Sequence, residues 1–195
     1  MTWLPGAAPL PPALQRPVPS RLERLKATPR KPGEASFFFH DAHFHNDAVK
    51  VLPGEFFVHD EDILVMTTLG SCIAACIWDR NKRIGGMNHF LLPDAGGSAD
   101  SGRYGSFAMD LLIGELVKRG ATRCTMEAKV FGGGAVVSKD VLDIYPRKVC
   151  FLPHSGKAMV KRLASANTEA LAAQERAAAS RAVPAGSSGG SIDLF

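Results

Sequence analysis

The sequence predicts a mixed α and β fold, and two observations support this expectation. Short apolar segments rich in β-branched residues recur between polar or glycine-containing turns, which is typical of strands. One longer segment, residues 104–119, places apolar residues at helical spacing and is followed by Gly120, a common helix stop. Composition by itself does not decide how these layers pack.

The expected elements follow the chain in a simple order. Strands are expected near residues 49–52, 63–69, 73–78, 83–91, 122–131, 148–152 and 158–163, with the helix over 104–119 between the fourth and fifth. The polar residues 79–82 separate two of these strands and predict a hairpin. Residues 168–181 are expected to form at most a transient helix, and residues 184–191 a flexible linker.

Charge and composition divide the 195 residues into three parts. Residues 1–35 are proline-rich and hold six basic against two acidic side chains, which accounts for the whole net charge of +4. We expect a disordered basic arm over residues 1–35, a catalytic domain over 36–163, and an Ala/Ser/Gly-rich flexible tail over 164–195. The balanced charge of the domain argues against nucleic-acid binding.

Several other classes of protein are disfavoured by the same survey. No apolar run approaches the roughly 18 residues of a membrane span, and the N-terminal apolar patch is broken by prolines, unlike a secretory leader. We therefore expect no membrane insertion. The four cysteines show neither disulfide-like nor zinc-ribbon spacing, which favours a reduced, cytoplasmic location.

A nucleophile and a base lie on the two strands of the predicted hairpin. If its turn is centred between Arg80 and Asn81, Cys72 lies opposite His89, with Cβ atoms roughly 4.5–5.5 Å apart. An imidazole at that separation can deprotonate the thiol and leave a reactive thiolate. We also expect Gly70-Ser71 and Gly85-Gly86 to leave room for a substrate backbone.

Other candidate ligands do not form a convincing site. His40, His43 and His45 are close in sequence, and the last two would share a strand face, but no cysteine or carboxylate cluster completes a metal site. Cys76, Cys124 and Cys150 are interpreted as core residues. Residues 132–134 are expected to form a tight glycine turn beside the active site. We expect neither a metal nor an organic cofactor.

These motifs resemble the bacterial chemoreceptor glutamine deamidases of the CheD family. The resemblance rests on Leu69-Gly70-Ser71-Cys72, on the block from Gly85 to Pro93, and on an Asp143-Ile144-Tyr145-Pro146-Arg147 block. It begins near Phe38 and fades after Leu163. The family implies an α+β layered α/β/β sandwich, similar to the catalytic domain of cytotoxic necrotizing factor toxins.

The sequence departs from the family pattern in two places. The family's catalytic threonine or serine is expected six residues before Cys72, where this chain has Met66. Strand alternation then favours Thr68 as the third catalytic residue over Thr67, because Thr68 would share a face with Cys72. The second departure is a segment, a helix and a strand in relatives, that is missing after the Gly-rich loop, where residues 135–140 pass directly on.

The resemblance also implies an activity. Cys72, His89 and Thr68 would convert specific glutamines on the cytoplasmic helices of methyl-accepting chemotaxis receptors to glutamate through a thioester. It further implies a CheC-type phosphatase as a partner. Two alternatives remain open from the residues: a binding module with impaired catalysis, motivated by Met66 and the missing segment, and a Cys–His hydrolase acting on a small amide or ester.

Overall fold

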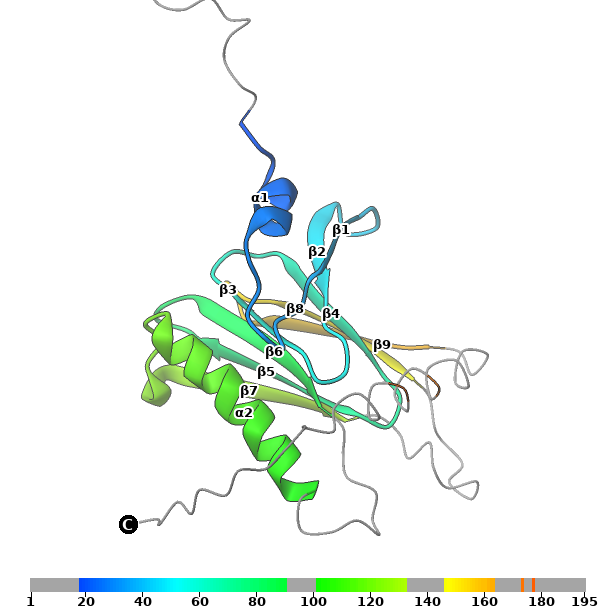
Figure 1. The fold of residues 1–195 in the computed structure, drawn as a ribbon, viewed down its shortest axis with the longest axis vertical. Coiled ribbons are helices and arrows are strands. Elements are labelled where there is room, and N and C mark those ends of the chain that lie inside the picture. The colour runs from blue at the N-terminus through cyan, green and yellow to red at the C-terminus, as the bar shows by residue number, and fades with distance from the viewer. Residues whose placement is uncertain (1–17, 91–100, 133–145, 164–172, 174–176, 178–195) are drawn as a thin grey trace, which may run out of the picture.

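The computed structural model describes residues 18–90, 101–132 and 146–163, together with residues 173 and 177. Two β-sheets pack face to face, and one long helix, α2, lies on the outer face of the smaller sheet (Figure 1). No helix in this described part is long and apolar enough to cross a bilayer. The missing segment and the tail, expected near 135–140 and over 164–195, lie outside the described residues, apart from 173 and 177.

The larger sheet has five strands in the order β1-β2-β4-β8-β9. Their bounds are Phe37–Asp41 for β1, Asn46–Lys50 for β2, Leu64–Leu69 for β4, Arg147–Leu152 for β8 and Lys157–Arg162 for β9. Strand β2 runs parallel to β4, whereas the other neighbours are antiparallel. β4 therefore lies at the centre of this sheet.

The smaller sheet has four antiparallel strands in the order β3-β6-β5-β7. Their bounds are Phe56–His59 for β3, Ile84–Phe90 for β6, Ile73–Asp79 for β5 and Met126–Gly132 for β7, which follows a 3-10 turn at Arg123–Thr125. Helix α2, Ser101–Lys118, is followed by a turn at Gly120, whose φ of 93° is a conformation that glycine adopts without strain. Gly120 is thus confirmed as the helix stop.

Two separate cores hold these layers together. The interior between the sheets contains apolar side chains from both, among them Val65 and Leu69 of β4 and Ala74 and Cys76 of β5. A second cluster, including Leu112 and Leu116 of α2, fills the space between the helix and the smaller sheet. The predicted α/β/β layering is therefore confirmed.

The glycines of β6 serve internal packing rather than substrate approach. A Cβ on Gly86 would lie 2.6 Å from the carbonyl oxygen of Phe57 and 2.8 Å from the Leu112 side chain. A Cβ on Gly85 would lie 2.8 Å from the carbonyl oxygen of Pro153. The expectation that this pair would admit a substrate backbone is wrong, because the protein's own chain occupies the space.

Residues 18–35 are not the disordered arm that composition suggested. They include α1, Arg21–Ala27, whose capping box joins Ser20 and Glu23, and Leu25 of this helix is buried. The following backbone pairs with β3 through Ala35 N to Phe56 O at 2.9 Å and Phe56 N to Gly33 O at 2.9 Å. The folded domain therefore begins before residue 36, and residues 1–17 lie outside the described part.

Two basic side chains of this segment pair with acidic residues of the domain, and a third lies over aromatic rings, which composition could not reveal. Arg21 contacts Asp47 at 2.8 Å, and Lys31 contacts the buried Glu115 of α2 at 2.5 Å. Arg30 lies over the rings of Phe38 and Phe57, with distances to the ring centroids of 4.5 and 5.6 Å. These contacts fasten the N-terminal segment to β1, β2 and α2.

Most expected strands are confirmed, with errors at their ends. The strand expected at 49–52 is instead β2, Asn46–Lys50, and the one expected from 122 begins at Met126. α1, β1 and β3 were not predicted. The aromatic segments that became β1 and β3 are each only a few residues long, so their periodicity is weak.

A buried carboxylate fixes the turn between β5 and β6. Asp79, fully buried, accepts hydrogen bonds from the backbone N–H groups of Asn81, Lys82 and Thr122 at 2.9, 3.1 and 2.6 Å. Burial by itself raises the pKa of Asp79, but these donors and the Thr125 side chain outweigh it and lower the pKa from 3.8 to about 2. The folded state therefore prefers the charged form.

We predict that Asp79→Asn destabilises the protein at neutral pH by about 2 kcal/mol, since the folded state loses a preferred carboxylate. Because the folded-state pKa is depressed, this stabilisation is present above about pH 4 and is lost as the pH falls toward 2. Urea unfolding at several pH values checks this. The difference between wild type and variant should shrink below pH 4, whereas Asp110→Asn, a change in an exposed residue, should have little effect.

We also predict opposite effects of two glycine-to-alanine changes. Gly86→Ala should destabilise by several kcal/mol, because the new methyl group overlaps backbone and the Leu112 side chain. Gly114→Ala, in α2 with no atom within 4 Å of the added Cβ, should stabilise by roughly 0.5–1 kcal/mol. Thermal unfolding midpoints of the two variants measure this, and a neutral Gly86→Ala would contradict the close packing of α2.

Candidate active site

The hairpin of β5 and β6 has a register two residues away from the expected one. His89 pairs with Ala74 rather than with Cys72, because the turn is centred between Asn81 and Lys82 and includes Arg83. Arg83 has φ of 54°, and its N–H donates to Asp79 O at 2.8 Å, which closes this four-residue turn. Cys72 directly precedes β5 and so becomes a diagonal neighbour of His89, not its direct partner.

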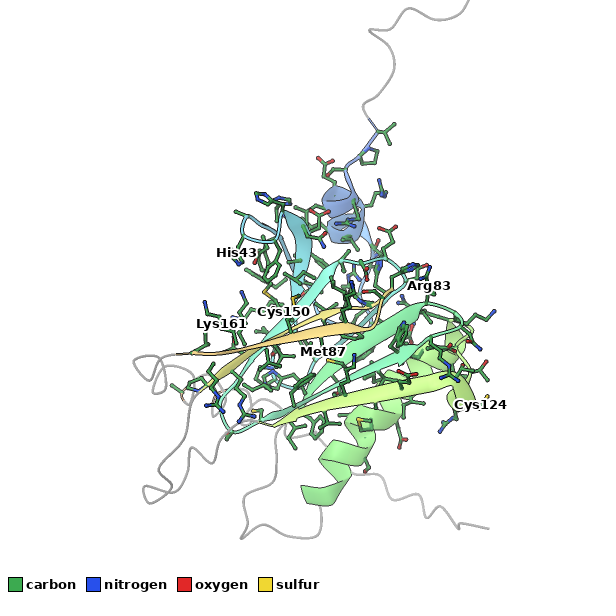
Figure 2. All side chains as sticks on the ribbon, turned by 180° about the vertical axis from the view of Figure 1, so that it is seen from behind. His43, Arg83, Met87, Cys124, Cys150 and Lys161 are labelled. Carbon is green, nitrogen blue, oxygen red and sulfur yellow. The ribbon has the colours of Figure 1, made fainter. Side chains whose placement is uncertain are left out.

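Cys72 and His89 nevertheless face the same interior. Cys72 belongs to the apolar cluster between the sheets, together with Ala74, and is 0% exposed. His89 is 2% exposed. Two residues apart on β6, His89 and Met87 share a face of the strand, and Met87, labelled in Figure 2, belongs to the same cluster. Both predicted residues therefore lie in the interior between the sheets, and the expected direct pairing is wrong.

A third polar side chain reaches His89 from the opposite sheet. The hydroxyl oxygen of Thr67, on β4, lies 2.8 Å from His89 Nδ1 and 2.7 Å from the carbonyl oxygen of Val51. Thr67 is 1% exposed. This hydrogen bond joins the two sheets at the site.

The two hydrogen bonds of Thr67 fix the protonation pattern of the imidazole. A carbonyl oxygen only accepts, so the single hydroxyl proton of Thr67 is donated to Val51 O. The hydroxyl oxygen then accepts from His89, which places the proton on Nδ1. In the neutral ring, Nε2 is left with the lone pair that a general base needs.

Thr68, the expected third residue, does not make this contact. Strand alternation puts Thr67 with Val65 and Leu69 on the face toward the other sheet, and Thr68 with Met66 on the outer face. The expectation assumed that alternation continues from β4 through Cys72. It does not, because the chain leaves one sheet at Leu69 and enters the other at Ile73.

The loop between β2 and β3 holds the backbone around His89 and Thr67 in place. Sequence reasoning did not identify this loop as part of the site. Gly54 N donates to His89 O at 2.8 Å, and His89 N donates to Glu55 O at 3.0 Å. Val51 N bonds to Met66 O at 2.9 Å, which fixes the carbonyl that receives the Thr67 proton. Burial raises the pKa of Glu55, opposed by the Leu52 N–H. The sequence signal was only the Pro53-Gly54 turn.

The other candidate residues lie apart from this site. His43 and His45 fall in the turn between β1 and β2 instead of sharing a strand face, and His40 Nδ1 lies 3.1 Å from Asp47 Oδ1. Among the described residues, no group of three or more potential ligands could hold a metal ion. Figure 2 shows His43 at one end of the molecule and Cys124 at another.

The remaining cysteines differ from one another. Cys76 and Cys150 are buried, as expected, whereas Cys124 is exposed in the turn before β7, so its interpretation as a core residue is wrong. Burial raises the pKa of the Cys76 thiol to about 12, despite Lys129 nearby. Cys76 is therefore unsuited to be a nucleophile.

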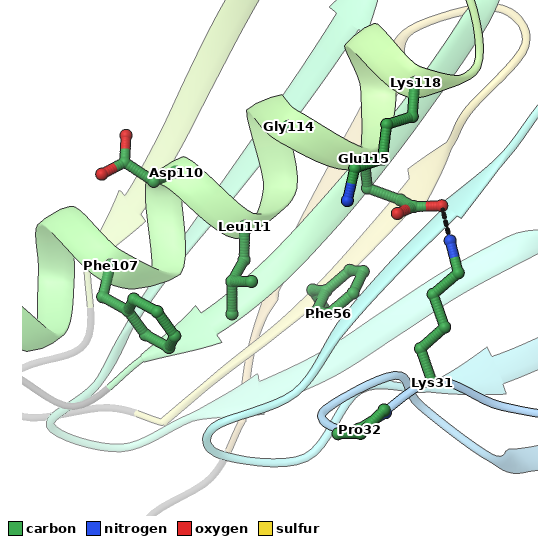
Figure 3. Close-up of a pocket in the computed structure, with 9 residues that line it drawn as sticks. All are labelled: Lys31, Pro32, Phe56, Phe107, Asp110, Leu111, Gly114, Glu115 and Lys118. Atoms are coloured by element: carbon green, nitrogen blue, oxygen red, sulfur yellow. Dashed lines mark hydrogen bonds and ion pairs between the residues drawn. The ribbon is translucent and has the colours of Figure 1, made fainter.

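A surface pocket of about 260 Å³ lies on the opposite side of the smaller sheet (Figure 3). It is bounded by α2 and the Lys31-Pro32 turn, and the Lys31–Glu115 ion pair crosses one end. Phe56, at its base, belongs to the core beneath α2. The pocket is thus separated from Cys72 and His89 by the sheet itself.

This chain is similar in sequence to a described protein family and to individual proteins of other bacteria. A family described as CheD chemotactic sensory transduction matches residues 91–140, downstream of Cys72 and His89. A protein of Albidiferax ferrireducens, named "Probable chemoreceptor glutamine deamidase CheD 1", is 54% identical over 90% of this chain and 87% of its own length. A protein of Janthinobacterium sp. (strain Marseille), named "Probable chemoreceptor glutamine deamidase CheD", is 41% identical over 83% and 95%.

The alignment with the A. ferrireducens protein shows that this relative contains additional residues. It spans 204 positions, more than the 195 residues of this chain, so the relative has residues with no counterpart here. A protein of Burkholderia mallei with the same name as the Janthinobacterium relative is 43% identical over 76% of this chain and 77% of its own length. Identity of this extent over most of both sequences shows that the chain belongs to the CheD family.

Proposed function

We propose that this chain is a protein-glutamine deamidase of chemoreceptors, in which Cys72 is the nucleophile and His89 the general base. The observation that carries the proposal is the hydrogen-bonded series Val51 O, Thr67 Oγ1 and His89 Nδ1, because it leaves Nε2 of His89 as the basic nitrogen. Cys72 faces the same interior between the sheets. The names of three relatives, each a chemoreceptor glutamine deamidase, supply the substrate class.

The reaction follows from these roles. His89 takes the thiol proton of Cys72, and the thiolate attacks the carboxamide carbon of a glutamine, giving a tetrahedral oxyanion. His89 then protonates the departing ammonia, and a thioester remains. Water activated by His89 hydrolyses the thioester, which leaves glutamate and restores the thiol. The chemistry needs neither a metal nor an organic cofactor.

Two further features, one of the backbone and one of a side chain, suit the same reaction. The N–H groups around Ser71 and Cys72, where the chain crosses between the sheets, are the candidates for stabilising the oxyanion. Thr67, in place of the expected Thr68, holds the imidazole ring through Nδ1 and stabilises the imidazolium that forms. Thr67 is therefore proposed as a positioning residue.

The partners and location are proposed on the family resemblance. The substrates would be the cytoplasmic helices of methyl-accepting chemotaxis receptors, and a CheC-type phosphatase would be a further partner. Both would place the protein in the cytoplasm. Nucleic-acid binding and membrane insertion are not expected.

A catalytically impaired binding module is the second candidate. Two observations favour it: Cys72 is 0% exposed, and the A. ferrireducens relative has residues that this chain lacks. A module that only binds receptors would keep the family's surface but leave glutamines unchanged. Turnover therefore separates the two functions.

We predict that wild-type protein deamidates a receptor fragment and that Cys72→Ser does not, because a hydroxyl is a far weaker nucleophile beside the same base. Intact-mass measurement of the fragment, with an assay for released ammonia, checks both. Cys76→Ser is a matched control, since Cys76, on β5, is buried like Cys72. No turnover by wild type would favour the binding module, and turnover by Cys72→Ser would remove Cys72 from its role.

His89→Asn should lose activity by several orders of magnitude, because asparagine forms hydrogen bonds but cannot shuttle a proton. The same mass measurement applies. Near-native turnover by this variant would show that another group acts as the base.

For the threonines, we predict that Thr67→Val slows deamidation by roughly ten- to a thousandfold while Thr67→Ser restores most of the rate, since an orienting hydrogen bond tunes the base without performing the chemistry. The pH profile of kcat/KM should also shift in Thr67→Val, because Nδ1 loses its acceptor. Thr68→Val, on the outer face, is the matched control and should be nearly silent. If Thr68→Val were the damaging change, the assignment of Thr67 would be wrong.

A further inference from the structure

The segment that carries Cys72 crosses between the sheets at one end of the sandwich. β4 ends at Leu69, which pairs with Arg147 of β8, and β5 begins at Ile73, which pairs with Gly132 of β7. Cys72 thus lies between two pairs of strand ends, one in each sheet. A side chain that joined β8 to β7 here would bridge the sheets beside the nucleophile.

Arg147 is that side chain. On β8 it shares a face with Val149 and Phe151, whose side chains belong to the core between the sheets. Its Nη1 donates to the carbonyl oxygen of Gly132 at 2.9 Å, a contact between the larger and the smaller sheet. The donor is charged, so this hydrogen bond is stronger than a neutral one.

The contact between Arg147 and Gly132 matters because Cys72 is buried. With the thiol 0% exposed, a glutamine side chain reaches it only if the surrounding structure opens. Opening at this end would separate β7 from β8, and the Arg147–Gly132 hydrogen bond resists that movement. Strand ends are among the regions that open most readily.

We propose that Arg147 is a positioning residue that bridges the two sheets at Gly132 and so controls access to Cys72. Its importance for turnover rests on the proposed deamidase function, whereas its effect on access does not. Loss of the bridge raises the population of the open form, and the thiol then reacts faster with reagents from solution. Larger reagents, which need a wider opening, gain most.

The test is alkylation of the native protein with a small reagent, iodoacetamide, and with a bulky maleimide. All proteins carry Cys124→Ser, which removes the exposed thiol, and modification of Cys72 is followed by fragment-ion mass spectrometry. In Arg147→Met, the ratio of the maleimide rate to the iodoacetamide rate at Cys72 should rise by roughly tenfold or more, as expected for loss of a charged hydrogen bond.

Two further variants sharpen the test. Lys148→Met is the matched control, because Lys148 is the next residue on β8 and lies on the outer face, 4.0 Å from Asp41. It should leave the ratio unchanged. Arg147→Lys keeps the charge but not the planar guanidinium, so its ratio should fall between those of wild type and Arg147→Met.

The outcomes are distinct. An unchanged ratio in Arg147→Met overturns the proposal. So does an equal rise at Cys72, Cys76 and Cys150, which would show general loosening, or a shift in the pH dependence of the Cys72 rate, which would show an effect on the thiol itself. Because alkylation needs no substrate, it decides the proposal even if the protein fails to deamidate receptors.

Discussion

The arrangement of the candidate site depends on one contact, the hydrogen bond between Thr67 and His89, which joins the two closely packed sheets. Thr67 lies at the centre of the larger sheet, and His89 lies on β6, which α2 covers from the other side. The hydrogen bond between them joins the two sheets within a largely apolar interior, and an unsatisfied imidazole there would cost free energy. Its geometry requires that both sheets keep their spacing, so the glycines beneath α2 and the loop at Gly54 support the site indirectly.

The N-terminal segment contributes to the same packing through charge. Composition places all of the net positive charge before residue 36, but Arg21 and Lys31 pair with acidic residues beyond it, and Arg30 pairs with Glu34 of the same segment. Glu34 and Glu115, both buried, pair with Arg30 and Lys31 respectively, and each also contacts Arg119, the residue after α2. The network ties α2 to the segment that pairs with β3, and thereby to the sheet that carries Cys72 and His89.

Sequence reasoning proposed Cys72 and His89 as a pair but did not predict their geometry. Cys72 and His89 were identified by residue type and motif, yet their predicted pairing failed, because Arg83 joined the turn and moved the register by two residues. The choice of Thr68 failed for a related reason. Alternation holds only within one strand, and the chain changes sheets between Leu69 and Ile73. Neither a turn's extent nor a change of sheet has a clear local signal.

The sequence alone determined the mixed α and β character, most strand positions, Gly120 as the stop after α2, and the choice of Cys72 and His89 as candidates, because these depend on local pattern and side-chain type. The tertiary structure decided which threonine meets His89, which imidazole nitrogen carries the proton, and that Arg147 meets Gly132. It also decided that residues 18–35 fold. Each of these is a contact between segments distant in sequence, and such contacts arise only when the two sheets and the helix pack together.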